Sequence, residues 1–542
     1  MRNILSDSCL CSGRTFYSAA LALLAGVVVP SVAWPQAPTG LDIASTIKMS
    51  ARVSVSEVYT SNVFLNNNPR SDLITEVSPG IRITSKGGRI QGSLDYSLTE
   101  QIYARNSSGR RSRNTFNGIG SAELLEDWAY VDFSGVVGQQ SISAFGAPST
   151  NLGAINGNST EVSTFRISPY VRGRLGGVAE YVARYSLTSS KSDAATVSGV
   201  DISDLSLSVR GSGARRGLGW SLEGSQQNAD YSLGRSTQSR RLGGSVGYPI
   251  DERFGVYLRG SRESNDFTGL ASTSKTFVAI GVNWTPNEEL KVSVDRNNDG
   301  VLGIDAAWNP SRRTSLSVTR QERLFGTTHR VALAYRTQSS AWTYSSSRTI
   351  NTDSGATSGF KAVDLYNVLV DQFAAAESDP VRREQFEASL QANGILPGAS
   401  ALVGFQSSSV NVQNQNQLSA ALFGARNTVT VLISRGTSSR LDTQTSAIDD
   451  FNTSSTVNQS GLSVNVSHRF SPQTVLNLLA ARQVNSGSGT QTGTSSRTVL
   501  LNLTTRLTKD TSAGIGLRRA VFDSPTNPYT ETAVTGNLNV QF

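Results

Sequence analysis

The feature that most constrains this chain is an alternation of polar and apolar residues that recurs along nearly its whole length. In the final stretch, "TAVTGNLNVQF" (532–542), every second position is apolar or small and the positions between are polar. A period of two is typical of a β-strand with one dry face and one wet face. Similar runs occupy 47–59, 89–104, 165–175, 179–187, 205–211, 276–284, 462–468, 499–507 and 513–521. Many of them have about the nine to eleven residues of a tilted membrane strand.

Short turns and longer polar connections follow one another along the chain. Turns such as 85–88, 285–289 and 508–510 are rich in Gly, Pro, Asn and Asp, whereas 106–114 and 139–159 are longer loops. Roughly two dozen strands can be threaded between them, and an open sheet of that size would expose its edges unless it closed. We therefore predict an all-β fold, a large antiparallel transmembrane up-and-down barrel of about 24 strands, within a range of 18–26. Its apolar face would meet lipid and its polar face a wet lumen.

The first 37 residues have the features of a secretory signal peptide. Arg2 and Arg14 precede an apolar run at 19–29, and "SVA" at 31–33 is a small-x-small cleavage signal, with Ala37 as an alternative end. The apolar run is too short for a spanning helix, and no other stretch approaches the roughly 18 apolar residues that such a helix needs. We expect export of a barrel domain covering 38–542.

The cysteines and the net charge limit the chemistry of the exported chain and the partners it suits. Cys9 and Cys11 both lie ahead of the apolar run, so the exported chain would contain no cysteine for disulfides or thiolate metal sites. A formal net charge of +8 suits an anionic partner without identifying one. An exported barrel without another anchor predicts the outer membrane of a Gram-negative cell, with outer-membrane lipid as its surroundings. A soluble exported β-sandwich or β-helix adhesin is the alternative.

Aromatic residues support the membrane interpretation. The tryptophans near proposed short turns, where an interfacial girdle belongs, are Trp128, Trp220, Trp284, Trp308 and Trp342. Trp128 falls on the polar phase and fits poorly, so the predicted interfacial residues are the other four. The chain ends on an aromatic residue after an alternating strand, which resembles the signal read by bacterial outer-membrane barrel assembly machinery. The residues of this predicted assembly signal are Leu538, Val540 and Phe542.

One segment, 361–395, departs from the alternation. Leu365, Leu369 and Phe373 are spaced four apart, which is a helical spacing. Asp379 and Pro380 then provide a helix start, and the following run ends at a glycine. We predict a helical hairpin inserted in one long connection, either capping the mouth or folding into the lumen.

Motifs for catalysis or metal binding are weak. His329 and His468 are far apart and within strand-like runs, and no GxSxG, HExxH, CxxC or P-loop pattern occurs. The stretch "DRNNDG" (295–300) matches half of a calcium loop, but Ala306 stands where a bidentate Glu is needed. We therefore predict no enzymatic activity, cofactor, metal site or nucleic-acid partner.

The polar phase of the strands is rich in arginine. Its predicted lumen-lining members are Arg52, Arg82, Arg166, Arg172, Arg174, Arg184, Arg210, Arg259, Arg506 and Arg518. Tyr103, Tyr170 and Tyr257 lie in the same phase, so the surface suits anions or an acidic polysaccharide that stacks on rings. Alternatively, acidic neighbours such as Glu76, Glu100 and Glu180 pair with these arginines, which then only brace a wide wall.

Three stretches resemble a known bacterial family. They are "VSEVYTSNVFLNNNPRSDLITEVSPGIRITSKGGRIQGSLDYSLTEQIYA" (55–104), "SDPVRREQFEASLQANGI" (378–395) and "ARNTVTVLISR" (425–435). They are similar to the PEP-CTERM system-associated outer membrane proteins. That resemblance implies an outer-membrane barrel belonging to exosortase and exopolysaccharide loci, with a part in export of polysaccharide or sorted surface proteins. It implies no catalytic residue.

Two functions follow from these observations. The first is a pore or secretion channel that serves export of exopolysaccharide or PEP-CTERM surface proteins. The second is a non-conducting structural or adhesive barrel that displays its long loops. Single-channel conductance distinguishes them, since only the first carries a steady ion current.

Overall fold

The computed structural model describes residues 47–542 except 107–110, 149–152, 195–196, 212–216, 233, 269–270, 352–356, 359–403, 408, 442–448, 490 and 492. The chain divides into two compact units, Met1–Ser45 and Thr46–Phe542, and every described residue belongs to the second. The predicted signal peptide (1–37) and helical insertion (361–395) lie outside the described residues.

Strands make up nearly all of the described part. They are β1 (Ile47–Thr60), β2 (Asp72–Gly87), β3 (Ile90–Tyr103), β4 (Arg111–Leu125), β5 (Ala129–Ser141), β6 (Ser159–Leu175), β7 (Ala179–Ser192), β8 (Val200–Gly211), β9 (Gly219–Tyr231), β10 (Ser236–Pro249), β11 (Phe254–Phe267), β12 (Thr273–Asn287), β13 (Leu290–Asn297), β14 (Leu302–Ser311), β15 (Thr314–Arg323), β16 (Gly326–Arg336), β17 (Ser340–Asn351), β18 (Thr357–Ser358), β19 (Phe405–Gln406), β20 (Asn411–Phe423), β21 (Asn427–Arg440), β22 (Thr456–Arg469), β23 (Thr474–Gly487), β24 (Thr494–Arg506), β25 (Thr511–Asp523) and β26 (Tyr529–Gln541). A short helix, α3 (Asp450–Thr453), precedes β22. Within these ranges no helix is long and apolar enough to cross a membrane.

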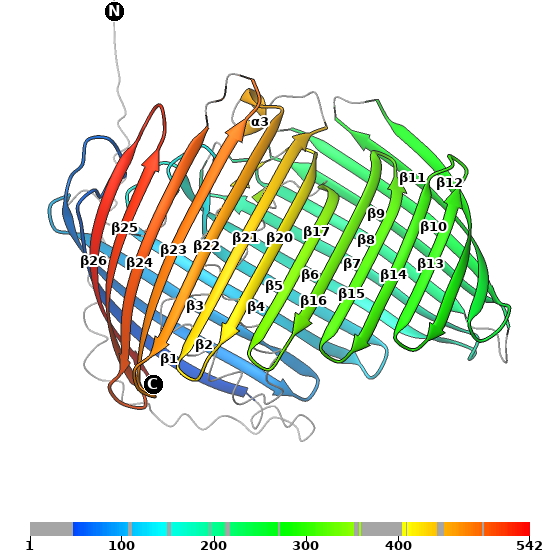
Figure 1. The fold of residues 1–542 in the computed structure, drawn as a ribbon, viewed down its shortest axis with the longest axis horizontal. Helices are drawn as coiled ribbons and strands as arrows, with labels where there is room; N and C mark the ends of the chain where they lie inside the picture. The colour runs from blue at the N-terminus through cyan, green and yellow to red at the C-terminus, as the bar shows by residue number, and fades with distance from the viewer. Residues whose placement is uncertain are drawn as a thin grey trace, which may run out of the picture. The chain divides into compact units, whose positions relative to one another are not determined.

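Twenty-four of the strands form one closed antiparallel sheet, which confirms the predicted barrel. Strands adjacent in the chain are adjacent in the sheet, β17 pairs with β20, and β26 returns to β1. The remaining two strands, β18 and β19, pair only with each other. Most short hairpin turns lie at one end of the barrel, together with the C-terminus, and most longer connections lie at the other (Figure 1). We name these the short-turn end and the long-loop end.

The last strand closes the barrel against the first. The register runs from Arg52 opposite Gln541 to Thr60 opposite Ala533. The backbone N–H of Phe542 then donates to the carbonyl oxygen of Ala51 at 2.8 Å. Pairing between β26 and β1 therefore closes the sheet along the seam from Arg52 to Thr60.

The apolar side chains lie on the outside of the barrel. Leu478, Leu501 and Leu517 stand opposite one another on three successive strands and share one face. Most large exposed hydrophobic side chains fall in this outward phase, whereas alternate positions such as Asn477 and Thr504 are buried. A soluble barrel would have the opposite arrangement, so the outer face is built to contact lipid.

Exposed aromatic side chains gather at the short-turn end, where the sequence predicted a girdle. Trp220, Trp284, Trp308 and Trp342 are each 39–43% exposed. Phe254 is opposite Trp284 and Tyr335 is opposite Trp342, so other aromatic rings extend the band. Such a band marks a membrane–water interface.

Trp128 also belongs to the outer surface. It lies in the turn before β5 rather than in a strand, so strand phase does not determine its direction. Its indole N–H donates to the Tyr181 hydroxyl at 2.8 Å, and Tyr181 shares the outward phase of Tyr185 and Leu187. The poor fit predicted for this residue therefore disappears.

Many strands continue beyond the alternating part of the sequence toward the long-loop end. The alternation in 165–175 becomes β6, Ser159–Leu175, and that in 462–468 becomes β22, Thr456–Arg469. Residues beyond the lipid meet water on both faces, so the polar–apolar contrast ends while the hydrogen-bonded ladder continues.

Candidate functional site

The ten predicted lumen-lining arginines all lie in the phase opposite the outward hydrophobic side chains. Seven of them are within ion-pair distance of a carboxylate on the same wall. The pairs are Arg52–Asp95, and at 2.6–3.7 Å Arg166–Asp204, Arg174–Glu180, Arg184–Asp132, Arg210–Glu223, Arg259–Asp295 and Arg518–Glu531. The arginines are distributed around the barrel rather than gathered at one site.

The other three arginines differ in their surroundings. Arg172 donates to the Tyr130 hydroxyl at 2.8 Å and lies 4.5 Å over the Tyr130 ring. Arg82 stands opposite Asp95 in the β2–β3 register. Arg506, near the short-turn end of β24, has no charged partner among the described residues.

Two of the tyrosines predicted on the wet face, Tyr170 and Tyr257, contact other side chains of the inner wall. Tyr170 stacks on Tyr130 with ring centroids 5.0 Å apart, and the Arg184 guanidinium lies 4.0 Å from the Tyr170 centroid. The Tyr257 hydroxyl donates to Asp295 at 2.9 Å. These contacts fit the interpretation that the arginines brace the wall, because charges and ring faces are already largely satisfied.

The described parts of the connection between β5 and β6, residues 142–148 and 153–158, enter the barrel at the long-loop end. Ala147 and Ala154 pack in a buried cluster with Phe522 and Tyr529 of β25 and β26. The loop's Ile155 packs against a second cluster formed by inward residues of β1, β2, β3 and β26, which are Val58, Ile74, Tyr103 and Ala533, together with Val63. This inward surface is therefore apolar, and the loop covers it. A separate inward apolar cluster, Val200, Ile202, Ala229 and Tyr231, lies on β8 and β9.

Hydrogen bonds to the backbone of the same loop, or from it, hold it against β3 and the connection between β1 and β2. The Ile155 N–H donates to the Val63 carbonyl oxygen, and the Tyr103 hydroxyl donates to the Gly153 carbonyl oxygen, both at 2.8 Å. We name residues 142–158 the mouth loop. The predicted polar loop at 139–159 is shorter in the structure, because β5 continues to Ser141 and β6 begins at Ser159. Its small and apolar residues give it a packed position that a polar loop was not expected to have.

Helix α3 binds the first residues of the mouth loop, Ser143 and Ala144. The Asp450 carboxylate accepts from the Ser143 hydroxyl at 2.6 Å and from the Ala144 N–H at 2.7 Å. The Asn485 side chain on β23 donates to the Ala144 carbonyl oxygen at 2.6 Å. Burial raises the pKa of the Asp450 carboxyl to about 6, although both hydrogen bonds act in the other direction. The loop therefore reaches from β5 and β6 to β23, past the seven strands β4, β3, β2, β1, β26, β25 and β24.

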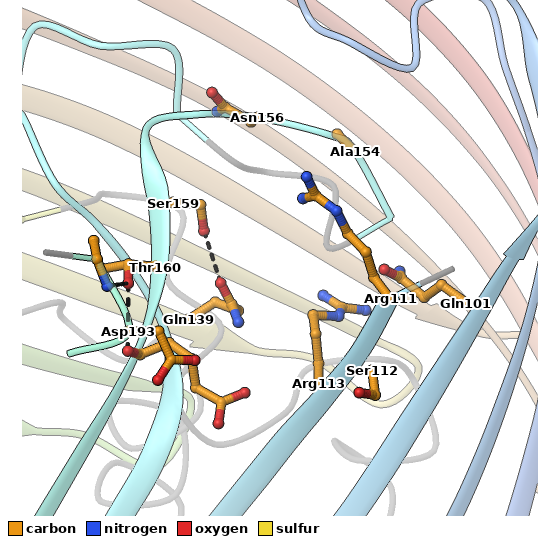
Figure 2. A pocket seen from close by; sticks show the side chains of 12 residues that line it. Gln101, Arg111, Ser112, Arg113, Gln139, Ala154, Asn156, Ser159, Thr160 and Asp193 are labelled. Carbon is orange, nitrogen blue, oxygen red and sulfur yellow. Dashed lines mark hydrogen bonds between the residues drawn. The ribbon is translucent and has the colours of Figure 1, made fainter. Parts of the chain in front are cut away.

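A polar opening lies in the wall beside the mouth loop. Pairing between β4 and β5 ends at Phe116 opposite Val137, although β4 continues to Arg111 and β5 to Ser141. A cavity of about 350 Å³ fills the gap, with Arg111 and Arg113 on one side and Gln139, Thr160 and Asp193 on the other (Figure 2). The volume is at the lower limit of ordinary ligand pockets.

Side chains from the strands around this opening contact one another, and Glu161 of β6 reaches β4 directly. The Glu161 carboxylate accepts from the Asn114 backbone N–H at 2.9 Å and from its side-chain amide at 3.1 Å. Arg113 lies 3.4 Å from Glu76, and the Ser159 hydroxyl donates to Gln139 at 3.0 Å. The cavity thus presents donors and acceptors of both charges, a lining that suits a hydroxyl-rich ligand.

The weak metal and histidine motifs have structural partners. Asp295 pairs with Arg259 and Asp299 with Lys275, each at 2.7 Å, while the Asn297 side-chain oxygen Oδ1 accepts from the Val301 backbone N–H at 2.8 Å. His468 is 2.6 Å from the Asn427 side-chain oxygen, and His329 is 3.3 Å from the Ser346 hydroxyl. Across the described ranges, no group of three His, Cys, Asp or Glu side chains could hold a metal ion.

A closed antiparallel barrel with an apolar outer face, an aromatic band and a polar interior defines a β-barrel of the outer-membrane class. No protein-family model matches this chain, and no curated protein sequence matches it. Among solved structures it is similar to the siderophore receptor PirA of Acinetobacter baumannii, with 9% identity, a TM-score of 0.40 and coverage of 91% of this chain and 80% of that one. The iron transporter FrpB of Neisseria meningitidis is similar at 12% identity and a TM-score of 0.44, covering 92% and 82%. At these values the likeness carries no inference about ligand or partner.

Proposed function

We propose that this protein is an outer-membrane channel for a large polar solute, and that its substrate is an extracellular polysaccharide. The main support for a channel is the polar inner wall of a closed ring of 24 strands. With strands about 4.8 Å apart and tilted by about 40°, such a ring has a backbone diameter of roughly 48 Å. That width leaves room for a hydrated polymer beside the mouth loop.

The choice of polysaccharide rests on two supports. The sequence resemblance to PEP-CTERM system-associated outer membrane proteins implies a role at exosortase and exopolysaccharide loci. The polar opening between β4 and β5 adds donors and acceptors from Arg111, Gln139 and Asp193, which hydroxyl groups can satisfy. Because most wall arginines are paired, we expect weak selection for charge rather than a strongly anionic path.

A structural or adhesive barrel is the second candidate, favoured by the mouth loop that is packed across the long-loop end. Planar-bilayer recordings separate the two candidates. The full chain is expected to conduct weakly, and replacement of residues 142–158 by a short Gly-Ser linker is expected to raise the conductance several-fold. Liposome swelling with oligosaccharides of graded length then measures the size limit. No current from either protein, with both correctly folded, would contradict the channel and support the structural barrel.

A further inference from the structure

Four arginines stand on the lipid-facing side of neighbouring strands, away from the lumen. Arg482 on β23 is directly opposite Arg497 on β24. Arg519 on β25 is opposite Val499, which is the next residue after Arg497 on the same face of β24. Arg435 on β21 completes the group, two strands away. All four are exposed, and they share the phase of Leu462, Leu501 and Leu517. We name Arg435, Arg482, Arg497 and Arg519 the outer arginine patch.

The patch lies at the long-loop edge of the apolar belt. Each of its residues is within five positions of the long-loop end of its strand, as the strand limits at Arg440, Gly487, Thr494 and Asp523 show. Toward the short-turn end, the same face continues with Ile433, Leu478 and Ile515. A bilayer that covers these hydrophobic side chains places its polar headgroups at the level of the arginines.

The charges of the patch are poorly balanced by the protein. Arg497 pairs with Asp523 at 2.7 Å, and Arg519 donates to the Thr532 hydroxyl at 3.1 Å. Within the part of the chain that the structure describes, Arg435 and Arg482 make no ion pair. Like charges directly opposite each other in a sheet are destabilising, so the Arg482–Arg497 pair gains from an anion held between them. The inner wall differs, since seven of its ten predicted arginines face carboxylates.

We infer that the outer arginine patch binds the phosphate groups of an anionic lipid in the leaflet adjoining the long loops. Guanidinium groups bind phosphate through paired hydrogen bonds, and the hydrophobic face below holds the acyl chains of the same molecule. A free anion would use only the first of these contacts. Further arginines of the outward phase, Arg240, Arg262, Arg296 and Arg320, are also exposed near the long-loop ends of β10, β11, β13 and β15, on another part of the barrel.

Lipid binding to the purified full chain tests this inference. The probes are lipid A with two phosphates and its fully dephosphorylated analogue, which have identical acyl chains, measured by native mass spectrometry in a neutral detergent. We expect the phosphorylated lipid to bind at least tenfold more tightly. The variant Arg435→Gln/Arg482→Gln/Arg519→Gln is expected to lose about a hundredfold in affinity for it, at about fivefold per arginine.

The matched control is Arg174→Gln/Arg210→Gln/Arg506→Gln, which removes the same charge from the lumen side and is expected to keep the affinity. Heat-modifiable migration on gels checks that both variants fold. Equal binding of the two lipids by the unaltered protein would overturn the inference even if a variant misfolded. It would also fail if the control lost as much affinity as the patch variant, or if millimolar inorganic phosphate displaced the lipid.

Discussion

At the scale of single residues, the inner wall contains ion pairs of very different burial. The Arg518 side chain is 12% exposed and Glu531 is fully buried, whereas Arg174 and Glu180 are 78% and 67% exposed. Thr60 also donates to Glu531 at 2.7 Å, so this carboxylate belongs to a buried polar group beside the closure of the barrel. Exposed pairs contribute little because water screens them, but a buried charge depends strongly on its partner.

Replacement of Arg518 tests that difference. Arg518→Ala is expected to lower the free energy of unfolding by about 3–5 kcal/mol, because Glu531 would keep its charge in a buried place without the guanidinium. Arg174→Ala is the control, with an expected loss below about 1 kcal/mol. Denaturant unfolding in liposomes measures both values. Equal losses would show that burial does not govern the strength of these pairs.

At the scale of elements, the mouth loop and α3 form a contact between segments far apart in the chain. Among the described residues of the two segments, the Asp450 carboxylate joins them directly, through Ser143 and Ala144. The neighbouring charged groups are Asp449, which caps α3, and Arg440, which donates to the Phe451 carbonyl oxygen at 2.7 Å. This contact can respond to pH because the Asp450 carboxyl is buried.

Docking of the mouth loop is expected to weaken as pH rises from about 4 to about 6. The pKa of Asp450 is raised from 3.8 to about 6 by burial, so the docked state binds a proton more tightly than the undocked state. Proton binding to Asp450 therefore stabilises the docked loop fully below pH 3.8, the pKa of the undocked carboxyl. This stabilisation, roughly 3 kcal/mol, is lost as the pH rises through the docked pKa of about 6.

Conductance measured between pH 4 and pH 8 is expected to follow this change. The current should be lower on the acidic side, because the docked mouth loop obstructs the lumen there. Asp450→Asn is expected to remove the dependence, since the amide keeps an acceptor for the Ala144 N–H without titrating. An unaltered pH profile in Asp450→Asn would assign the effect to another group.

At the scale of the whole molecule, the barrel reverses the arrangement of a soluble protein. Leucines such as Leu501 lie outside, and polar residues such as Asn502 lie inside. The hydrophobic effect then stabilises insertion of the closed barrel rather than the packing of a core. The buried apolar clusters in the described residues lie instead toward the long-loop end, where loops enter the barrel.

A pair of adjacent substitutions tests this orientation. Leu501→Arg is expected to lower the free energy of unfolding in liposomes by about 2–4 kcal/mol, because it places a charge among acyl chains. Asn502→Arg, one residue along the same strand, points into the lumen and is expected to cost much less. Equilibrium unfolding in vesicles gives both numbers. A larger loss for Asn502→Arg would mean that the two faces had been assigned the wrong way round.

Part of the fold was predictable because its cause is local. The alternation at 532–542 gives both the strand β26 and its two faces, and the four tryptophans predicted at the interface are exposed on the outer surface. The extension of β6 back to Ser159 was not predictable, because polar residues on both faces carry no periodic signal. The partners of Arg184 and Arg518 also depend on register across strands, which no local pattern specifies.

The sequence by itself determined the class of fold, since a two-residue period repeated over so many segments can satisfy every backbone group beside lipid only as a closed barrel. It also determined which face of each strand is apolar. The tertiary structure decided how far the wall arginines are neutralised, where the β4–β5 ladder stops and how the mouth loop docks. Those features arise from contacts between residues hundreds of positions apart, such as Ala144 with Asp450, and their energies depend on a geometry that exists only once the ring has closed.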